Sequence, residues 1–339
     1  MSATLPPIRH GGNLLAAVRR YGRPTDAWLD LSTGINPEGY PVAALPAHVW
    51  QRLPQDDDGL AELAARTCGA PQALPVAGSQ AAIRTLPALL RPGRVGVAAL
   101  GYSEYAPAFA EAGHTVVPLD EADFARTDLA DELDHLVVVN PNNPTGRLLP
   151  PAALLRWHAV LAARSGTLVV DEAFIDCMPE HSLAARSGDD GLVVLRSIGK
   201  FYGLAGIRCG FVLAQPALLA ALRERLGYWT VSGPAREVAR QALADHAWQA
   251  TTRTRLAASG TQLATLLDRH GLAPVMHQLF CWAPHADAAR LHEALAQHGI
   301  WTRLFDAAGG CPPSLRLGLP PDQPEAWQRL DAALAAVAA

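Results

Sequence analysis

The chain has 339 residues, half of them hydrophobic and 18% charged, and its 28 glycines and 27 prolines are spread along its length. This composition excludes a disordered or low-complexity protein, and the length predicts about two globular domains. The 28 basic and 32 acidic residues give a net charge of −4, which disfavours a nucleic-acid partner because contact with phosphate backbones requires an excess of basic residues.

Between residues 72 and 215, short β-branched runs alternate with helical patterns, which predicts βαβ units in a mostly parallel sheet. Consecutive apolar positions such as Val137-Val138-Val139 are typical of strands covered by helices on both faces. The predicted strands are Leu74–Ala77, Arg94–Ala99, His114–Leu119, His135–Asn140, Thr167–Asp171, Leu192–Arg196 and Gly210–Ala214.

After about residue 226 the pattern changes to helices rich in alanine and leucine, followed by short strands. The predicted helices are Pro234–His246, Gln249–His270, Ala286–His298 and Asp322–Ala338, and the predicted strands are Leu279–Ala283, Ile300–Phe305 and Leu315–Leu319. This order predicts a smaller α/β domain at the C-terminus.

The five cysteines never form a Cys-x-x-Cys pair, so neither a disulfide framework nor a metal site is predicted. The N-terminus lacks the basic and apolar segments of a signal peptide, and no stretch of about 18 apolar residues could span a bilayer. We therefore expect a cytoplasmic protein without a membrane partner.

Of the 28 basic residues, 27 are arginine, which leaves one lysine, Lys200. An arginine stays protonated, whereas a lysine with a lowered pKa can form a Schiff base. The single lysine indicates a chemical role, although a coding bias against lysine would also leave one by chance.

Three polar motifs lie at or just after the carboxyl ends of predicted strands, where α/β proteins bind their ligands. They are Asn-Pro-Asn-Asn-Pro-Thr-Gly at 140–146, Val-Val-Asp-Glu-Ala-Phe at 169–174 and Ser-Ile-Gly-Lys at 197–200. Arg208 follows Lys200 by eight residues. We expect all of these groups to lie at one edge.

Four of these residues match the needs of a pyridoxal phosphate enzyme. Lys200 supplies an amine, Asp171 a carboxylate for the pyridine nitrogen, and Arg208 and Ser197 a cation and a hydroxyl for the phosphate. Taken singly, Asp171 also fits a helix cap and Arg208 a surface cation. The four residues occur together in one order and spacing along the chain, which favours a cofactor site over four unrelated roles.

The motifs Ser-x-x-Lys, Asn-Pro-Thr-Gly and Val-Asp-Glu-Ala resemble those of the fold-type I pyridoxal-phosphate enzymes of the aspartate aminotransferase superfamily, over nearly the whole chain. The resemblance implies the α/β fold of these transferases, with a mostly parallel seven-stranded sheet in the large domain. It also implies a homodimer, an N-terminal arm (1–35) packed on the small domain, a large cofactor-binding domain (36–225) and a small C-terminal domain (226–339).

The resemblance implies a role for each residue of the motifs. Lys200 would be the Schiff-base lysine, Asp171 would contact the pyridine nitrogen, and Asn143 the ring hydroxyl. Ser197 and Arg208 would bind the cofactor phosphate.

Further implied contacts come from outside these motifs. Ser79 and Gln80 would offer backbone N–H groups at a helix N-terminus to the same phosphate. Tyr102 would stack on the pyridine ring, unless it is only a core aromatic. Arg316 would bind the α-carboxylate of the substrate.

The segments His-Gly-Gly-Asn at 10–13 and Asp-Leu-Ser-Thr-Gly-Ile-Asn-Pro at 30–37 are similar to those of the threonine-phosphate decarboxylases of cobalamin biosynthesis, which are related to histidinol-phosphate aminotransferases. The likeness implies that His10, Asn36 and Arg303 contact the substrate phosphate. For His10 and Asn36, capping of a loop is the alternative.

Two positions depart from the relatives. Phe174 stands where histidinol-phosphate enzymes usually have a tyrosine, so a hydroxyl near the cofactor ring is missing. Leu53 stands where relatives often have a tyrosine that reaches the cofactor phosphate of the partner subunit, so this contact cannot form.

The resemblance implies decarboxylation of L-threonine O-3-phosphate to (R)-1-amino-2-propanol O-2-phosphate. A histidinol-phosphate or other phospho-amino-acid aminotransferase is the first alternative, because it would share nearly all of these residues. A non-catalytic regulatory module on the same fold is the second, although it would not explain Lys200.

Overall fold

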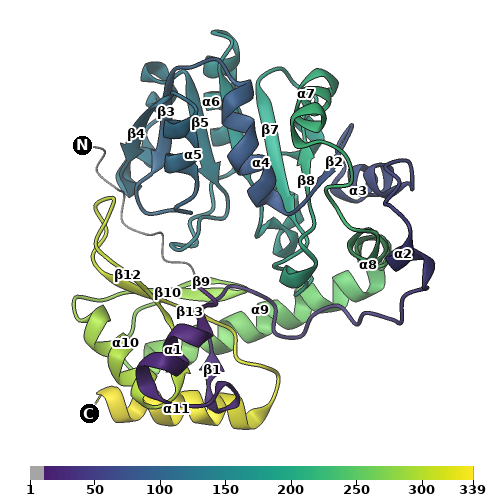
Figure 1. Ribbon diagram of the computed structural model, residues 1–339. Helices are drawn as coiled ribbons and strands as arrows, with labels where there is room; N and C mark the ends of the chain where they lie inside the picture. The colour runs from purple at the N-terminus through teal and green to yellow at the C-terminus, as the bar shows by residue number, and fades with distance from the viewer. Residues whose placement is uncertain (1–10, 339) are drawn as a thin grey trace.

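Five adjacent parallel strands form most of the larger sheet in the computed structural model, which describes residues 11–338 (Figure 1). The strand order is β2-β8-β7-β6-β5-β3-β4, and only β8 runs antiparallel to its neighbours. The strands are β2 (Leu74–Val76), β3 (Arg94–Ala98), β4 (Thr115–Leu119), β5 (His135–Val139), β6 (Thr167–Asp171), β7 (Leu192–Ser197) and β8 (Gly210–Leu213). The predicted mostly parallel, seven-stranded sheet is confirmed.

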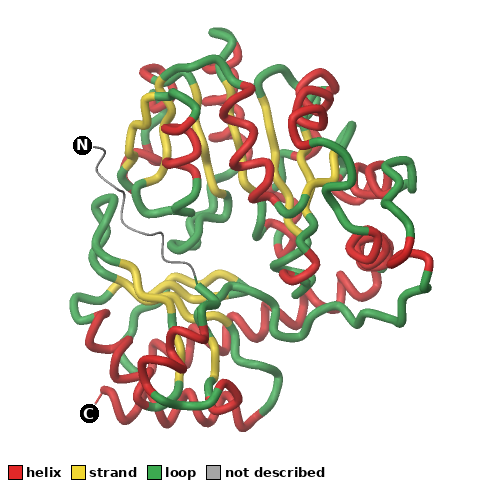
Figure 2. The backbone as a smooth tube through the Cα atoms, viewed as in Figure 1, coloured by secondary structure: helices red, strands yellow, loops and turns green. Residues whose placement is uncertain are grey.

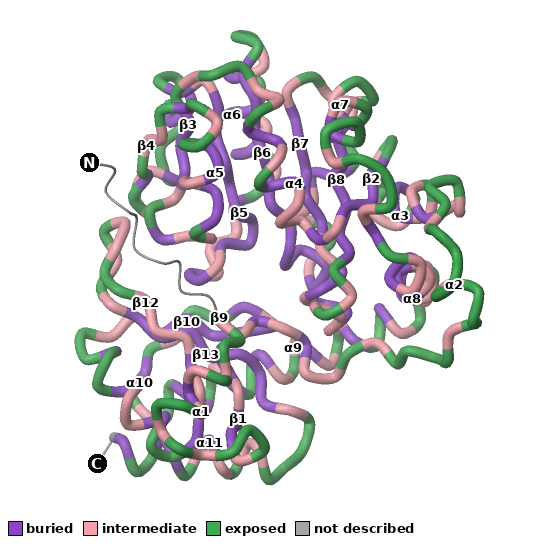
Figure 3. Tube along the Cα trace, viewed as in Figure 1, coloured by how far each residue is buried: buried purple, intermediate pink, exposed green. Residues whose placement is uncertain are grey.

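Helices cover both faces of this sheet because its strands alternate their apolar side chains between two cores. Val137 and Val139 pack with residues of α4 (Ser79–Thr85), α5 (Tyr105–Glu111) and α7 (Pro216–Leu226). Leu136 and Val138 belong to the opposite core, with residues of α6 (Pro151–Ala162). Figure 3 shows these strands as the most continuously buried part of the chain.

The remaining helices precede the sheet or follow it in the chain. They are α1 (Leu14–Tyr21), α2 (His48–Gln51), α3 (Leu60–Cys68), α8 (Gly233–Ala244), α9 (His246–Arg269), α10 (Ala288–Gln297) and α11 (Pro324–Ala338). Short 3-10 helices are η1 (Thr25–Ala27), η2 (Leu86–Leu89), η3 (Glu121–Ala125), η4 (Leu129–Glu132), η5 (Ile175–Cys177), η6 (Pro179–His181), η7 (Ala184–Arg186) and η8 (Ala205–Ile207).

Helix α9 leads from α8 to the C-terminal part of the chain, where Figure 1 labels it and Figure 2 draws it as a long red helix. It begins three residues earlier than predicted, because the Asp245 side chain accepts a hydrogen bond from the backbone N–H of Trp248 at 2.9 Å. Such a cap satisfies one of the free N–H groups of the first turn. Further along, α9 packs against two strands of a second sheet, β9 (Val275–His277) and β10 (Phe280–Pro284).

A smaller antiparallel sheet has the order β12-β13-β10-β9, and a parallel pair joins β1 to β11. These strands are β1 (Leu29–Asp30), β9 (Val275–His277), β10 (Phe280–Pro284), β11 (Ile300–Trp301), β12 (Arg303–Phe305) and β13 (Ser314–Gly318). The prediction of one strand over Ile300–Phe305 is wrong. The chain changes partner at Thr302, whose buried hydroxyl lies 2.8 Å from Nδ1 of His292.

The N-terminal segment meets the C-terminal part of the chain at two places. Strand β1 pairs with β11, and Arg20 and Tyr21 of α1 both donate hydrogen bonds to Glu293 of α10, at 2.7 and 2.8 Å. The division at residues 35 and 225 stays a prediction, as does the cytoplasmic location. Among residues 11–338, no helix is long and apolar enough to cross a membrane.

Candidate functional site

Lys200 lies where two neighbouring cavities meet, beyond the carboxyl end of β7. The first cavity is lined by all of the predicted cofactor contacts: Ser79, Gln80, Tyr102, Asn143, Asp171, Ser197, Lys200 and Arg208. The second cavity opens toward the smaller sheet, and Arg303, Phe305 and Arg316 line it. The structure therefore brings the predicted cofactor residues together, next to two of the predicted substrate residues.

The amine of Lys200 has a lowered pKa. Burial, Arg316 and Arg208 lower its pKa to about 8 from the usual 10.5, against the opposing effect of Asp171. A lysine with a pKa near 8 is partly neutral at physiological pH, and the neutral amine is the nucleophilic form. Lys200 can therefore attack a carbonyl carbon in the cavity.

Asp171 is a buried carboxylate at the end of β6. The Tyr105 hydroxyl donates to one of its oxygens at 2.7 Å, and the backbone N–H of Ala173 donates to the other at 3.0 Å. Burial raises its pKa, while these two hydrogen bonds and the charge of Lys200 act to lower it. A cationic group placed in the cavity would stabilise the ionised form.

The turn between β2 and α4 lines the first cavity together with Arg208. Gly78 has φ 71°, and a Cβ added there would lie 2.8 Å from Nη2 of Arg208. Glycine thus lets the guanidinium approach the backbone at the start of α4, where the N–H groups of Ser79 and Gln80 have no partner inside the helix. The Ser197 hydroxyl faces the same cavity. Together these donors suit a phosphate.

The ring of Tyr102 is held by polar and aromatic contacts. Its hydroxyl donates to Gln80 at 2.9 Å, and Gln80 donates to Glu104 at 2.6 Å. Tyr105 meets the ring edge to face, with centroids 6.2 Å apart. Tyr102 therefore presents an oriented ring to both cavities, and its stacking on a cofactor stays a prediction.

Two arginines face each other across the pairing of β12 with β13. Arg303 is the direct partner of Arg316 in the register, and the ring centroid of Phe305 lies 5.2 and 6.0 Å from their guanidinium carbons. Burial and then Arg303 lower the pKa of Arg316 to about 9. Because like charges at paired positions repel, an anionic ligand would stabilise this arrangement.

Arg316 is further held by the backbone carbonyl of Ser32, to which it donates at 2.7 Å, and by the Asn143 side-chain oxygen. Its Nε is buried without a hydrogen-bond partner. This contact between Asn143 and Arg316 connects the walls of the two cavities. The predicted contact of Asn143 with a ring hydroxyl stays a prediction.

The three predicted phosphate contacts are placed differently. Arg303 lines the second cavity, whereas the Asn36 side chain is buried in hydrogen bonds with Phe201 and Arg255 and lines neither cavity. His10 lies outside the described residues. Sequence reasoning missed Phe305, although its place two residues after Arg303 puts both side chains on one face of the strand.

Phe174 packs into an aromatic group instead of offering a hydroxyl. Its ring meets Phe280 edge to face at 5.2 Å and lies 5.8 Å from Nζ of Lys200. The side wall of both cavities is therefore apolar at this position.

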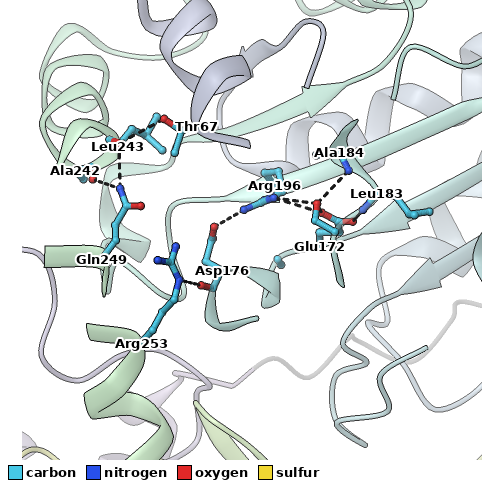
Figure 4. A network of polar contacts seen from close by, with 12 residues as sticks. Thr67, Glu172, Asp176, Leu183, Ala184, Arg196, Ala242, Leu243, Gln249 and Arg253 are labelled. Carbon is cyan, nitrogen blue, oxygen red and sulfur yellow. Dashed lines mark hydrogen bonds and ion pairs between the residues drawn. The ribbon is translucent and has the colours of Figure 1, made fainter. Parts of the chain in front are cut away.

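A buried ionic network supports the strand ends behind the cavities (Figure 4). Arg196 contacts the carboxylates of Glu172 and Asp176, while Glu172 also accepts from the Ser182 hydroxyl at 2.5 Å and from the Leu183 N–H at 2.7 Å. Glu172 directly follows Asp171 in the chain, and Arg196 directly precedes Ser197. The network therefore fixes the ends of β6 and β7.

Comparison with known proteins gives one family and several relatives. The family described as "Aminotransferase class I and II" matches residues 55–330. A threonine-phosphate decarboxylase of Pseudomonas aeruginosa is 52% identical over 96% of this chain and 97% of its own length. One from a Sinorhizobium species is 43% identical over 93% and 94%.

A solved structure shows the same fold. Histidinol-phosphate aminotransferase from Sinorhizobium meliloti, in complex with pyridoxal-5'-phosphate, matches with a TM-score of 0.80 and 21% identity, over 99% of this chain and 95% of that one. The predicted fold class is confirmed.

We predict that Arg196→Met lowers the free energy of unfolding by about 3 to 5 kcal/mol, because it leaves two buried carboxylates without their cation. Urea unfolding followed by circular dichroism measures the change. Arg126→Met, which removes an exposed pair with Asp128, should cost far less, because water and salt screen an exposed ion pair. Equal losses in the two variants would contradict the role given to the network.

Proposed function

Because the chain belongs to the class I and II aminotransferases, and within them to the threonine-phosphate decarboxylases, we propose that it decarboxylates L-threonine O-3-phosphate to (R)-1-amino-2-propanol O-2-phosphate. The cofactor is pyridoxal 5'-phosphate, and the reaction serves cobalamin biosynthesis. One observation carries the choice of substrate: Arg303 and Arg316 face each other beside Lys200, where a substrate with two anionic groups can bind both.

The first cavity fits the cofactor at each of its polar ends. The close approach of Arg208 to the Gly78 turn places a cation beside the N–H groups that begin α4, which suits a phosphate. Buried Asp171 suits a cationic ring nitrogen, and Lys200 offers a partly neutral amine. When bound, pyridoxal phosphate supplies an electron sink for the electron pair left on the substrate α-carbon as carbon dioxide departs.

Lys200 has two tasks in this proposal. Its partly neutral amine would hold the cofactor, and Nζ would also donate the proton that takes the place of the departed carbon dioxide on the substrate α-carbon. Asp171 would hold the ring nitrogen of the cofactor, because Tyr105 and Ala173 each donate to the carboxylate and fix its orientation. Its negative charge would favour the protonated form of that nitrogen.

The arginine pair orients the substrate. Arg303 binds the phosphate and Arg316 the α-carboxylate, each through the paired N–H groups that guanidinium presents to such anions. Phe305 lies beneath both guanidinium groups and keeps this side of the cavity apolar, which strengthens the charged contacts.

A phospho-amino-acid aminotransferase would use the same residues, so the reaction itself separates the two functions. We predict that the loaded enzyme releases carbon dioxide and 1-amino-2-propanol phosphate from L-threonine O-3-phosphate through many turnovers without a 2-oxoacid. Carbon dioxide release and phosphorus NMR follow the reaction. A reaction that stops after one turnover, and resumes when a 2-oxoacid is added, would identify an aminotransferase.

We predict that Arg303→Ala lowers kcat/KM for threonine phosphate roughly 30-fold to several thousand-fold, because losing one partner of a buried charged contact costs about 2 to 5 kcal/mol. Binding of the cofactor should be unchanged, as Arg303 lies outside the first cavity. Arg316→Ala should weaken binding of phosphorylated and unphosphorylated amino acids alike.

The control is Arg290→Ala, which removes an exposed arginine of α10. Steady-state kinetics and absorbance of the bound cofactor report the two effects. An Arg303→Ala enzyme as active as the parent on threonine phosphate would overturn the phosphate site.

We also propose a homodimer, supported by an exposed apolar groove beside the first cavity. Val42, Trp50, Leu53 and Trp229 line it and are 48%, 66%, 65% and 56% exposed. Ile207, next to Arg208 in the chain, lines it as well. A second copy would cover this apolar surface with its own equivalent, as two-fold pairing requires.

Trp50→Asp combined with Leu53→Asp should therefore yield 36.0 kDa monomers in light scattering, since two buried charges would oppose association. Met276→Asp, at an exposed apolar residue outside the groove, should leave the dimer intact. A parent protein that is active as a monomer would contradict the proposal.

A further inference from the structure

The turn that carries Lys200 packs along an N-terminal segment, residues 36–40. The backbone N–H of Asn36 donates to the carbonyl of Lys200 at 3.0 Å, and that of Tyr40 donates to Tyr202 at 2.8 Å. Gly203 has φ 67°, and a Cβ there would lie 2.5 Å from Cα of Gly39. The two segments thus meet backbone to backbone.

The side chain of Asn36 adds a second contact to the same turn. Its amide nitrogen donates to the carbonyl of Phe201 at 2.9 Å, and the residue is 2% exposed. Asn36 therefore satisfies the carbonyls of both Lys200 and Phe201. Because unpaired buried carbonyls are costly, removing this side chain leaves the turn less well determined.

Arg255 of α9 fixes the orientation of the Asn36 amide. Its Nη2 donates to the Asn36 side-chain oxygen at 2.9 Å and to the Glu38 carbonyl at 3.2 Å. The Glu38 N–H also donates to the Asn36 oxygen, at 3.0 Å. With two donors on the oxygen and a carbonyl beside the nitrogen, only one amide orientation satisfies every group.

We propose that Asn36 is a positioning residue for Lys200, held in place by Arg255, and that it does not contact the substrate phosphate. This inference rests on the proposed function in taking Lys200 as the cofactor lysine. It assigns α9 a further task, because the helix that packs on the smaller sheet also holds the turn that bears the reactive amine.

The variants Asn36→Ala and Arg255→Ala test the inference, with Thr254→Ala as the control at an exposed site on the same helix. In both test variants, the pH midpoint of the cofactor absorbance without substrate should shift in the same direction. kcat should fall roughly 10- to 100-fold, as small misplacements of reacting groups do. Arg255→Lys, which keeps a cationic donor, should recover part of the loss.

Substrate binding should change little. KM for threonine phosphate and the inhibition constant of inorganic phosphate should stay within roughly twofold of the parent values. Because the two residues act through one contact, the double variant Asn36→Ala/Arg255→Ala should lose less than the product of the two single losses.

A parent-like cofactor titration in Asn36→Ala, together with a raised phosphate inhibition constant, would overturn the inference and return Asn36 to the phosphate site. An Arg255→Ala enzyme with the parent's cofactor titration and kcat would also overturn the inference. If Asn36→Ala does not fold, this variant alone decides the test. A parent enzyme without cofactor on Lys200 would instead refute the proposed function.

Discussion

The structure is organised around the half-buried Lys200, whose amine has a lowered pKa. Lys200 lies between two guanidinium groups, those of Arg208 and Arg316, and burial together with these charges brings its pKa to about 8. Asp171 acts in the opposite direction and prevents a larger shift. In the proposed function the same two cations also bind anions, so activation of the lysine and recognition of phosphate and carboxylate would depend on one charge arrangement.

These charged groups keep their positions only if the strand ends and turns that carry them are held rigidly. The ends of β6 and β7 are joined by the Glu172 and Arg196 network, which fixes Asp171 and the start of the lysine turn. On the other side, Asn36 and Arg255 hold the same turn from α9. Rigid support of this kind places reactive groups with the accuracy that catalysis needs.

The features of the fold and the site that depend on hydrophobic periodicity and local spacing could be predicted from the sequence. Buried strands could be recognised from consecutive apolar residues, and Arg303 and Arg316 were each expected within a strand, as the structure shows. The break at Thr302 was not predictable, because it depends on a distant partner strand. Asn36 was assigned to the phosphate from the resemblance, with loop capping as the alternative. No local pattern shows its hydrogen bond to Arg255, which lies 219 residues further along the chain.

The central claim, that Lys200 carries the cofactor, has one direct measurement. Borohydride reduction of the loaded protein, cleavage after the flanking Arg196 and Arg208, and mass analysis should place pyridoxal phosphate on the peptide that contains Lys200. Because Lys200 is the only lysine, its amine competes only with the N-terminal one. A label on the N-terminal peptide, or no label after reconstitution with pyridoxal phosphate, would contradict the account.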